Sequence, residues 1–466
     1  MTGSLPLEPS DAQMRALLDA AGSYVREHIR TLPEQPSWDL EDFEPLVEAL
    51  RAPPPATGVA FDHVLAQIAA AVPKSLNTAA PGYLAYIPGG GLFTAALADF
   101  IAAAVNRYVG LWFPSPALVQ METSVLRWLC DVFGYPRASQ GILTSGGSMA
   151  NFSAIVTARR ARLGEDFLRG TIYVTEHTHH SVAKAAHIGG FPARNVRKVP
   201  AGNDLRMDID TLHRLIKEDQ RDGLEPFLVV ASLGTTNTGA VDPIGAILPI
   251  ARDEGLWVHA DAAYGGFSFL TDRGRALFDG VTEADSITLD PHKGMFLPYG
   301  TGALLVRDAQ ALRAAHSVEE DAAYLQDLAA GESLPNFADL SPELSRDFRG
   351  LRVWLPLQVH GTDAFRDALD EKLDLTRYLF EQLRDEPALE LPWEPELSVV
   401  AFRARGGSNE ASRALLERIN DSKRIFCSST IIDDRFIVRA CIVSHRTHLD
   451  RIEEAAGIIR AAARAL

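Results

Sequence analysis

Between about residue 80 and residue 355, the sequence repeats one pattern, in which a short apolar run is followed by a stretch with helical periodicity. The apolar runs lie at residues 141–144, 171–174, 227–232, 256–259, 286–289 and 302–306. Runs of this length that are separated by helices are typical of a buried, mostly parallel β-sheet with helices on both faces. The pattern therefore predicts a large α/β domain over residues 81–355.

A helical segment precedes this domain. Residues 1–80 contain amphipathic helical patterns at 12–29 and 61–71, and the proline triplet at 53–55 between them cannot continue a helix. Such a segment is too thin to fold as a globule of its own. We therefore expect it to pack on a partner subunit.

A smaller region follows the domain. Residues 356–466 open with helical patterns, continue with two strand-like runs at 397–402 and 435–442, and end with a helical pattern at 449–463. This order of elements predicts a small C-terminal α+β domain.

Composition excludes several classes of function. The chain has 466 residues and a formal net charge of −16, so it repels phosphate backbones and nucleic-acid binding is not expected. The most apolar helical stretch, residues 92–105, is too short to span a membrane, and the first residues lack a signal peptide pattern. The three cysteines are odd in number and form no CxxC pair, which indicates reduced thiols and a cytoplasmic protein.

A glycine-rich turn follows the first apolar run. Gly146 and Gly147 allow the backbone to approach a ligand closely, and Ser148 adds a hydroxyl group. The helix that follows offers N–H groups and the positive end of its dipole, which together can hold a phosphate. The alternative is a purely structural turn.

Histidines gather after the second apolar run, at His177, His179 and His180. They can belong to a metal site or to a polar loop. The separated cysteine or carboxylate partners of a zinc site are missing here, so we expect no metal.

Three later strand ends also carry polar groups. Thr235 and Thr236 follow one apolar run, and Asp261 follows the next, where a buried carboxylate needs a partner or caps the following segment. Lys293 lies just past a further run. A lysine is usually solvated or ion-paired, but burial lowers its pKa and makes the amine a nucleophile.

Together these groups match the needs of pyridoxal 5′-phosphate (PLP). Ligands of open α/β sheets bind beyond the carboxyl ends of the strands, where all of these groups lie. The glycine turn can hold the phosphate, and Asp261 can keep the pyridine nitrogen protonated. Lys293 can form the Schiff base.

The sequence resembles the group II PLP-dependent amino-acid decarboxylases, and most of all their aromatic L-amino-acid decarboxylase branch. The resemblance runs from Pro81 to Thr447 and rests on motifs in a fixed order: Ser-Gly-Gly-Ser, His-His-Ser-Val, Gly-Thr-Thr, His-x-Asp-Ala-Ala-Tyr and Asp-Pro-His-Lys. It implies a PLP-dependent transferase-like fold (fold type I) with a mostly parallel, seven-stranded central sheet. It also implies a homodimer with the active site at the subunit interface.

The resemblance assigns a role to each matching position. Lys293 is implied to bond the cofactor, Asp261 to pair with the pyridine nitrogen, and His179 to stack on the ring near the substrate carboxylate. Further cofactor contacts are implied for Gly146, Gly147, Ser148, Thr236, Ala263, Asp290 and His292.

Substrate contacts follow from the same resemblance. Tyr324 matches the tyrosine of a mobile catalytic loop that protonates the substrate α-carbon; a short surface helix is the other interpretation of this segment. Relatives with phenylalanine at this position tend to form aldehydes, so Tyr324 favours simple decarboxylation. The substrate pocket is implied at Tyr86, Pro88, Tyr108 and Trp112.

Two positions depart from the pattern of the family. Many relatives carry asparagine where this chain has Asp290, and a carboxylate cannot donate a hydrogen bond to phosphate unless it is protonated. Aromatic-specific relatives often carry phenylalanine where this chain has Gly110. Either the pocket is roomier here or Arg107 meets an acidic substrate.

The sequence therefore predicts PLP-dependent decarboxylation of an L-amino acid, foremost an aromatic one such as tyrosine, DOPA or tryptophan, to the amine and carbon dioxide. Three alternatives stay open. One is an acidic substrate such as glutamate, aspartate or cysteine sulfinate. Another is a different PLP reaction, either aldehyde formation or carbon–carbon cleavage of a phosphorylated substrate. The last is a silent PLP-binding protein, which the intact Lys293, Asp261, His179 and Tyr324 disfavour.

Overall fold

The computed structural model describes residues 5–87, 89–317 and 334–466. Its centre is a seven-stranded sheet in the order β2-β8-β7-β6-β5-β3-β4. β8 is antiparallel to both of its neighbours, and the other pairs are parallel. The strands are β2 (Gln140–Thr144), β3 (Gly170–Thr175), β4 (Val196–Val199), β5 (Glu225–Ser232), β6 (Trp257–Asp261), β7 (Ser286–Leu289) and β8 (Gly302–Val306). The mostly parallel seven-stranded sheet expected from the resemblance is confirmed.

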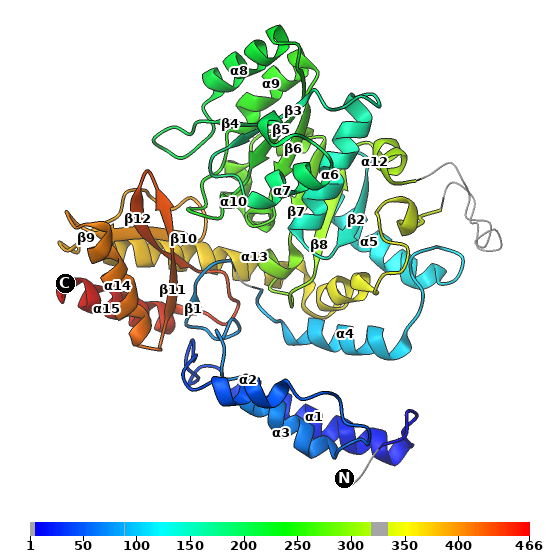
Figure 1. The fold of residues 1–466 in the computed structure, drawn as a ribbon, viewed down its shortest axis with the longest axis vertical. Helices are drawn as coiled ribbons and strands as arrows, with labels where there is room; N and C mark the ends of the chain where they lie inside the picture. Colours follow the sequence, from blue (N-terminus) through cyan, green and yellow to red (C-terminus); the bar gives the residue numbers. More distant parts are fainter. Residues whose placement is uncertain (1–4, 88, 318–333) are drawn as a thin grey trace.

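Helices surround this sheet (Figure 1). They bury apolar side chains against strands whose own side chains are buried on both faces, which is why the strands read as continuous apolar runs. The helices are α4 (Phe93–Val105), α5 (Pro116–Val132), α6 (Gly147–Arg162), α7 (His180–Ile188), α8 (Ile209–Arg221), α9 (Ile244–Glu254), α10 (Asp272–Leu277), α11 (Pro291–Gly294) and α12 (Ala309–His316).

A second sheet lies beside the first one, in the order β1-β11-β12-β10-β9 (Figure 1). α13 (Arg349–Arg384), which is kinked at Gly361, runs from the large domain to this sheet, and α14 (Asn409–Asp421) and α15 (Leu449–Arg464) pack near it. Its strands are β1 (Tyr83–Leu84), β9 (Leu389–Glu390), β10 (Val399–Ala404), β11 (Phe426–Ile432) and β12 (Arg435–Cys441). The two strands expected after residue 356 are present as β10 and β12, and the structure adds β9 and β11, which the sequence did not indicate.

The N-terminal segment forms α1 (Asp11–Thr31), α2 (Glu44–Leu50) and α3 (Phe61–Ala71), which project from the rest of the chain in Figure 1. α1 begins with a capping box between Ser10 and Gln13. None of these three helices contains a buried residue. The polypeptide after α1 is tied to the C-terminal region, since Trp38 Nε1 donates to the Asn420 carbonyl at 2.7 Å. Within the described part of the chain, no helix has both the length and the apolar character of a membrane span.

Candidate active site

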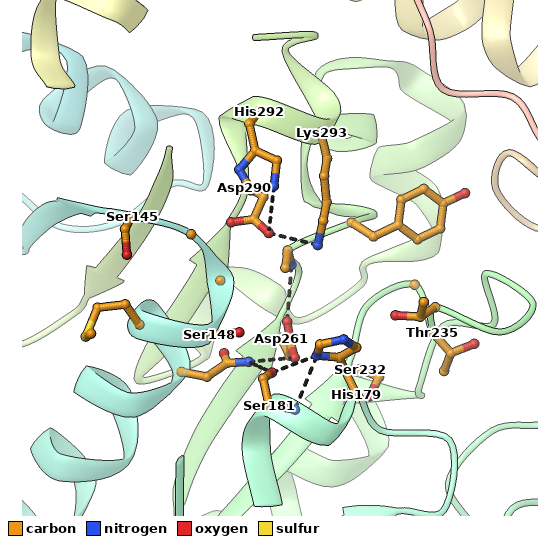
Figure 2. Close-up of a pocket in the computed structure, with 18 residues that line it drawn as sticks. Ser145, Ser148, His179, Ser181, Ser232, Thr235, Asp261, Asp290, His292 and Lys293 are labelled. Atoms are coloured by element: carbon orange, nitrogen blue, oxygen red, sulfur yellow. Dashed lines mark hydrogen bonds and ion pairs between the residues drawn. The ribbon is translucent and has the colours of Figure 1, made fainter. Parts of the chain in front are cut away.

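A cavity of about 240 Å³ lies where β3, β5, β6 and β7 end and α6 begins (Figure 2). All ten residues predicted to contact the cofactor line it. The lining consists of Ser145, Gly146, Gly147, Ser148, Met149, Asn151, His179, Ser181, Ser232, Gly234, Thr235, Thr236, Asp261, Ala263, Tyr264, Asp290, His292 and Lys293. The carboxyl ends of parallel strands thus bring together residues that are far apart in the sequence.

The glycine turn forms one wall of the cavity. Gly146 has φ 151° and ψ 172°, a conformation that favours glycine, and α6 starts at the next residue. A Cβ atom on Gly147 would lie 2.9 Å from Asp290 Oδ2 and 3.1 Å from the Ala263 Cβ. No side chain of Gly147 therefore covers the backbone N–H groups at the start of α6, and accessible N–H groups of this kind are what an anion site requires.

Asp261 is at the end of β6 and is 7% exposed. Its Oδ2 accepts a hydrogen bond from Asn151 Nδ2 at 3.0 Å, and its Oδ1 accepts one from the Ala263 N–H at 3.3 Å. These donors hold a carboxylate at the floor of the cavity. A carboxylate held in this way can stabilise a cationic ring nitrogen.

A chain of hydrogen bonds orients the amide of Asn151. Trp257 Nε1–H donates to Ser286 Oγ at 2.8 Å, so the Ser286 hydroxyl is able to donate to His259 Nδ1, also at 2.8 Å. Burial lowers the pKa of His259 to about 4, so its ring is neutral. Its proton is on Nε2, because Asn151 Nδ2 faces the acceptor Asp261 and leaves Asn151 Oδ1 facing Nε2. That Nε2–H donates to Asn151 Oδ1 at 3.1 Å, which turns the Asn151 NH₂ group toward Asp261.

The same amide reaches His179 through a serine. Asn151 Nδ2 also donates to Ser181 Oγ at 3.0 Å, and the Ser181 hydroxyl and N–H both point to His179 Nδ1, at 2.8 and 3.3 Å. Because Nδ1 accepts from the N–H, the proton of the neutral ring is on Nε2. Burial lowers the pKa of His179, and the charge of Asp261 partly opposes that shift.

Lys293 and Asp290 lie on the other side of the cavity from Asp261 and His179 (Figure 2). Lys293 Nζ is 2.8 Å from Asp290 Oδ2, and Asp290 is 2% exposed. His292 Nδ1–H donates to the Thr301 carbonyl at 2.6 Å, and burial lowers the pKa of this histidine. A lysine amine thus faces the cavity with a single carboxylate as its ion-pair partner among the described residues.

The second sheet also shapes the cavity. Arg439 on β12 donates to the carbonyl oxygens of Thr236 and Asn237, the latter at 2.7 Å. Tyr264 OH lies 2.7 Å from Ser398 Oγ and accepts from the Ser398 N–H at 2.9 Å. The C-terminal region therefore holds two cavity segments in place.

Sequence reasoning missed Asn151, Ser181 and Tyr264 as site residues. Ser181 and Tyr264 lie inside motifs that carried the resemblance, and Asn151 lies three residues after the Ser-Gly-Gly-Ser motif. Spacing offered a signal for Asn151, because residues three apart on a helix share a face.

Three predicted substrate residues, Tyr86, Tyr108 and Trp112, do not line this cavity. Tyr86 has φ 53° and donates its N–H to Ser428 Oγ at 3.1 Å. Tyr108 OH donates to the Leu344 carbonyl at 3.1 Å, and the Trp112 N–H donates to an asparagine side chain at 3.1 Å. Tyr324 and Pro88 lie outside the described residues, so the substrate pocket stays a prediction.

The departure at Gly110 does not leave a void. A Cβ atom there would lie 2.7 Å from the Leu344 carbonyl oxygen and 2.9 Å from Tyr108 OH. Neighbouring groups of the same chain therefore fill the space of the missing side chain. Arg107, the other residue considered for an acidic substrate, is exposed.

Comparison with known proteins identifies the family. Residues 49–405 match the pyridoxal-dependent decarboxylase conserved domain. The chain belongs to this family. It is an enzyme that uses PLP to decarboxylate amino acids, and the glycine turn, the buried Asp261 and the cavity-facing Lys293 fit that cofactor.

Individual relatives span almost the whole chain. An aromatic-L-amino-acid decarboxylase of Bacillus atrophaeus is 32% identical over 95% of this chain and 93% of its own. The crystal structure of Oryza sativa TDC with PLP and tryptamine has a TM-score of 0.93 at 26% identity and covers 99% of both chains. A phenylacetaldehyde synthase of Petunia hybrida is 27% identical over 82% of this chain and 80% of its own.

Proposed function

We propose that this protein converts an aromatic L-amino acid, of the tyrosine, DOPA or tryptophan type, to the corresponding amine and carbon dioxide. The observation that carries the proposal is the single cavity that joins Lys293, Asp261, His179 and the glycine turn. The similarity to the aromatic-L-amino-acid decarboxylase of Bacillus atrophaeus supports the substrate class.

Each part of the cavity has a task in this proposal. The glycine turn of Gly146, Gly147 and Ser148 binds the cofactor phosphate, with the free N–H groups of Gly147 and Ser148 at the start of α6 as donors and with Thr236 and Ala263 beside the ring. Asp261 keeps a proton on the ring nitrogen, because the amide of Asn151 stabilises the charged carboxylate. Bound PLP supplies an acceptor for the electron pair left when the carboxylate bond of the substrate breaks.

Three side chains act near the reacting atoms in this proposal. The amine of Lys293 would bond the cofactor and would be set free when the amine of the substrate replaces it. His179 presents Nε2–H to the cavity, because Ser181 occupies its Nδ1. Tyr324 returns a proton to the substrate α-carbon, an assignment that rests on the sequence.

The proposal includes a homodimer with shared active sites. The N-terminal helices contain no buried residue in the single chain, although α1 exposes Met14, Leu18 and Val25 by 42%, 51% and 38%. A second copy would cover these side chains and bring the predicted pocket residues Tyr86, Pro88, Tyr108 and Trp112 to the cavities. Cys130, Cys427 and Cys441 are free and buried, which supports a cytoplasmic location.

A substrate panel tests the proposal. Tyrosine, DOPA, tryptophan, 5-hydroxytryptophan, phenylalanine, histidine, glutamate, aspartate and cysteine sulfinate are offered in turn, and carbon dioxide, amine, aldehyde and peroxide are all measured. We expect stoichiometric amine and carbon dioxide from an aromatic substrate. Turnover of acidic substrates alone would contradict the proposed substrate, and aldehyde with peroxide would assign the reaction of the Petunia hybrida relative instead.

A further inference from the structure

Asp290 has a buried oxygen that the proposed function leaves without a task. Its side chain is 2% exposed, and Oδ2 lies 2.8 Å from Lys293 Nζ. Its Oδ1 is buried and accepts no hydrogen bond from the residues that the structure describes. An unsatisfied buried carboxylate oxygen is costly, so its position indicates a missing donor.

The carboxylate lies against the glycine turn. A Cβ atom on Gly147 would be 2.9 Å from Asp290 Oδ2 and 3.3 Å from Oδ1, so both oxygens face the first residue of α6. This is the turn that would hold the cofactor phosphate. A phosphate dianion and a carboxylate repel each other, and neither one can donate a hydrogen bond to the other.

The neighbours within its own segment cannot resolve this repulsion. Lys293 is the cation in contact, but its amine is the group that bonds the cofactor. His292 lies 3.8 Å away through Nε2, and its Nδ1–H already donates to the Thr301 carbonyl. Burial lowers the pKa of His292, so its ring is neutral. Because the proton is on Nδ1, Nε2 has a lone pair and cannot donate a hydrogen bond to Asp290.

The titratable and charged side chains on other elements near Asp290 also interact with other partners. His179, before α7, and Asp261, at the end of β6, lie together on the opposite side of the cavity, and the charge of Asp261 acts on His179 more strongly than that of Asp290 does. Arg352 on α13 donates to Asp99 and Thr301, and its charge lowers the pKa of His292. In the first turn of α6, Gly147 and Ser148 have no side chain that titrates near neutral pH.

We propose that Asp290 takes up one proton when PLP binds and shares it with the cofactor phosphate. The proton comes from solvent, and the resulting O–H at Oδ1 donates to a phosphate oxygen. In the protein without cofactor, the charged carboxylate instead pairs with Lys293. The inference rests on the proposed function, since it requires PLP in this cavity.

The proposal makes the contribution of the phosphate depend on pH. Below about pH 6 a phosphate ester is singly protonated in solution, so it can itself donate the hydrogen bond to the carboxylate and no proton has to be taken up. Above that range, binding has to take one proton from solvent. Linkage then weakens the phosphate contribution by about tenfold for each pH unit.

A binding cycle isolates this effect from activity. Full-length protein freed of cofactor is titrated with PLP and with pyridoxal, which has the same aldehyde but lacks the phosphate, between pH 6 and pH 8.5. The same titrations are made on Asp290→Asn, whose amide is a neutral donor. Asp272→Asn is the matched control, because its side chain is 101% exposed and lies on α10 away from the cavity. The ratio of the affinity for PLP to the affinity for pyridoxal isolates the contribution of the phosphate, because both ligands bond Lys293 through the same aldehyde.

We expect the PLP-to-pyridoxal affinity ratio of the wild type and of Asp272→Asn to fall by about tenfold per pH unit above pH 7 relative to that of Asp290→Asn. Calorimetry of the wild type in two buffers of different ionisation enthalpy should count about one more proton taken up with PLP than with pyridoxal at pH 8. This count needs no variant, so it decides the question even if Asp290→Asn fails to fold. A pH-independent ratio, or equal proton counts, would overturn the role of Asp290 while leaving the proposed function intact. Failure to bind PLP at any pH would overturn both.

Discussion

Lys293 and Lys372 border the same small pocket but are held in different ways. Lys372 is 2% exposed and donates to the Thr447 carbonyl, with Glu371 Oε2 at 2.9 Å as its counter-ion. The amine of Lys372 is therefore committed to the fold. Among the described residues, Lys293 has Asp290 as its ion-pair partner and donates to no backbone carbonyl, so its amine is available to a cofactor.

Replacing Lys293 by alanine should abolish decarboxylation and the visible absorbance of the bound cofactor. The reason is that no other described residue that lines the cavity offers an amine. Turnover and the absorption spectrum of the protein incubated with PLP are the measurements. Lys184→Ala, at an exposed position of α7, is the control and should behave as wild type. Normal activity of the Lys293 variant would refute the assignment.

Asn151→Ala should weaken PLP binding roughly 10- to 100-fold, because an unsatisfied buried polar group costs about 1–3 kcal/mol. The change removes donors from Asp261 and Ser181 and the acceptor of His259. Equilibrium titration with PLP measures the loss of affinity. A shift of the visible absorption maximum of the bound cofactor to shorter wavelength would report an altered charge at the ring nitrogen. Asn203→Ala, on an exposed loop, is the matched control. Equal affinities of the two variants would show that Asn151 does not position Asp261.

At the scale of elements, two of the strands that the sequence did not reveal, β4 and β11, have polar side chains. β4 contains Arg197 and Lys198 and lies at the edge of its sheet, so it lacks an apolar run. β11 has Ser428, Ser429 and Thr430 at its centre. Ser428 accepts from Arg439 at 3.0 Å, so tertiary contacts stabilise a strand that periodicity alone does not indicate.

Asp242 joins the end of β5 to the loop before α8 and should make stability depend on pH. It accepts the N–H groups of Ser232 and Met207 at 2.7 and 2.8 Å, yet burial raises its pKa to about 7. The folded state therefore binds more protons than the unfolded state, whose aspartate pKa is about 3.9. This contribution is complete below about pH 4 and is lost as pH rises toward 7, by up to about 4 kcal/mol.

Urea unfolding at pH 5 and pH 8 measures this dependence. The free energy of unfolding of the wild type should fall more between the two pH values than that of Asp242→Asn, which does not titrate. Asp208→Asn is a suitable comparison, because Asp208 is exposed and caps α8 nearby. Parallel pH profiles of wild type and Asp242→Asn would contradict the predicted titration.

At the scale of the whole molecule, apolar side chains are exposed on helices at one end of the chain. On α4, Phe93, Leu97 and Phe100 are exposed by 46%, 41% and 52%. Exposed apolar surface of this kind marks an interface, and the proposed second copy would cover it.

Light scattering of the wild type should give a mass of twice 50.7 kDa. The double variant Leu97→Glu with Phe100→Glu should dissociate, because charges would be buried in an apolar interface, and it should lose activity if the active sites are shared. Leu168→Glu is the control, since Leu168 is also an exposed apolar residue, at 55%, and lies on a loop away from α4. An active wild-type monomer would refute the proposed dimer.

The sequence alone indicated six of the seven strands of the central sheet and the strand ends at which the cavity lies. Apolar runs identify buried parallel strands, and the carboxyl ends of such strands meet at one edge, so the order of motifs was enough to bring Gly146, Asp261 and Lys293 together. Only the tertiary structure decided how the groups are oriented. The Asn151–His259 hydrogen bond joins residues 108 positions apart, and the unsatisfied oxygen of Asp290 depends on where every neighbouring donor points. Hydrogen bonds depend on ångström-scale geometry, which residue spacing does not encode.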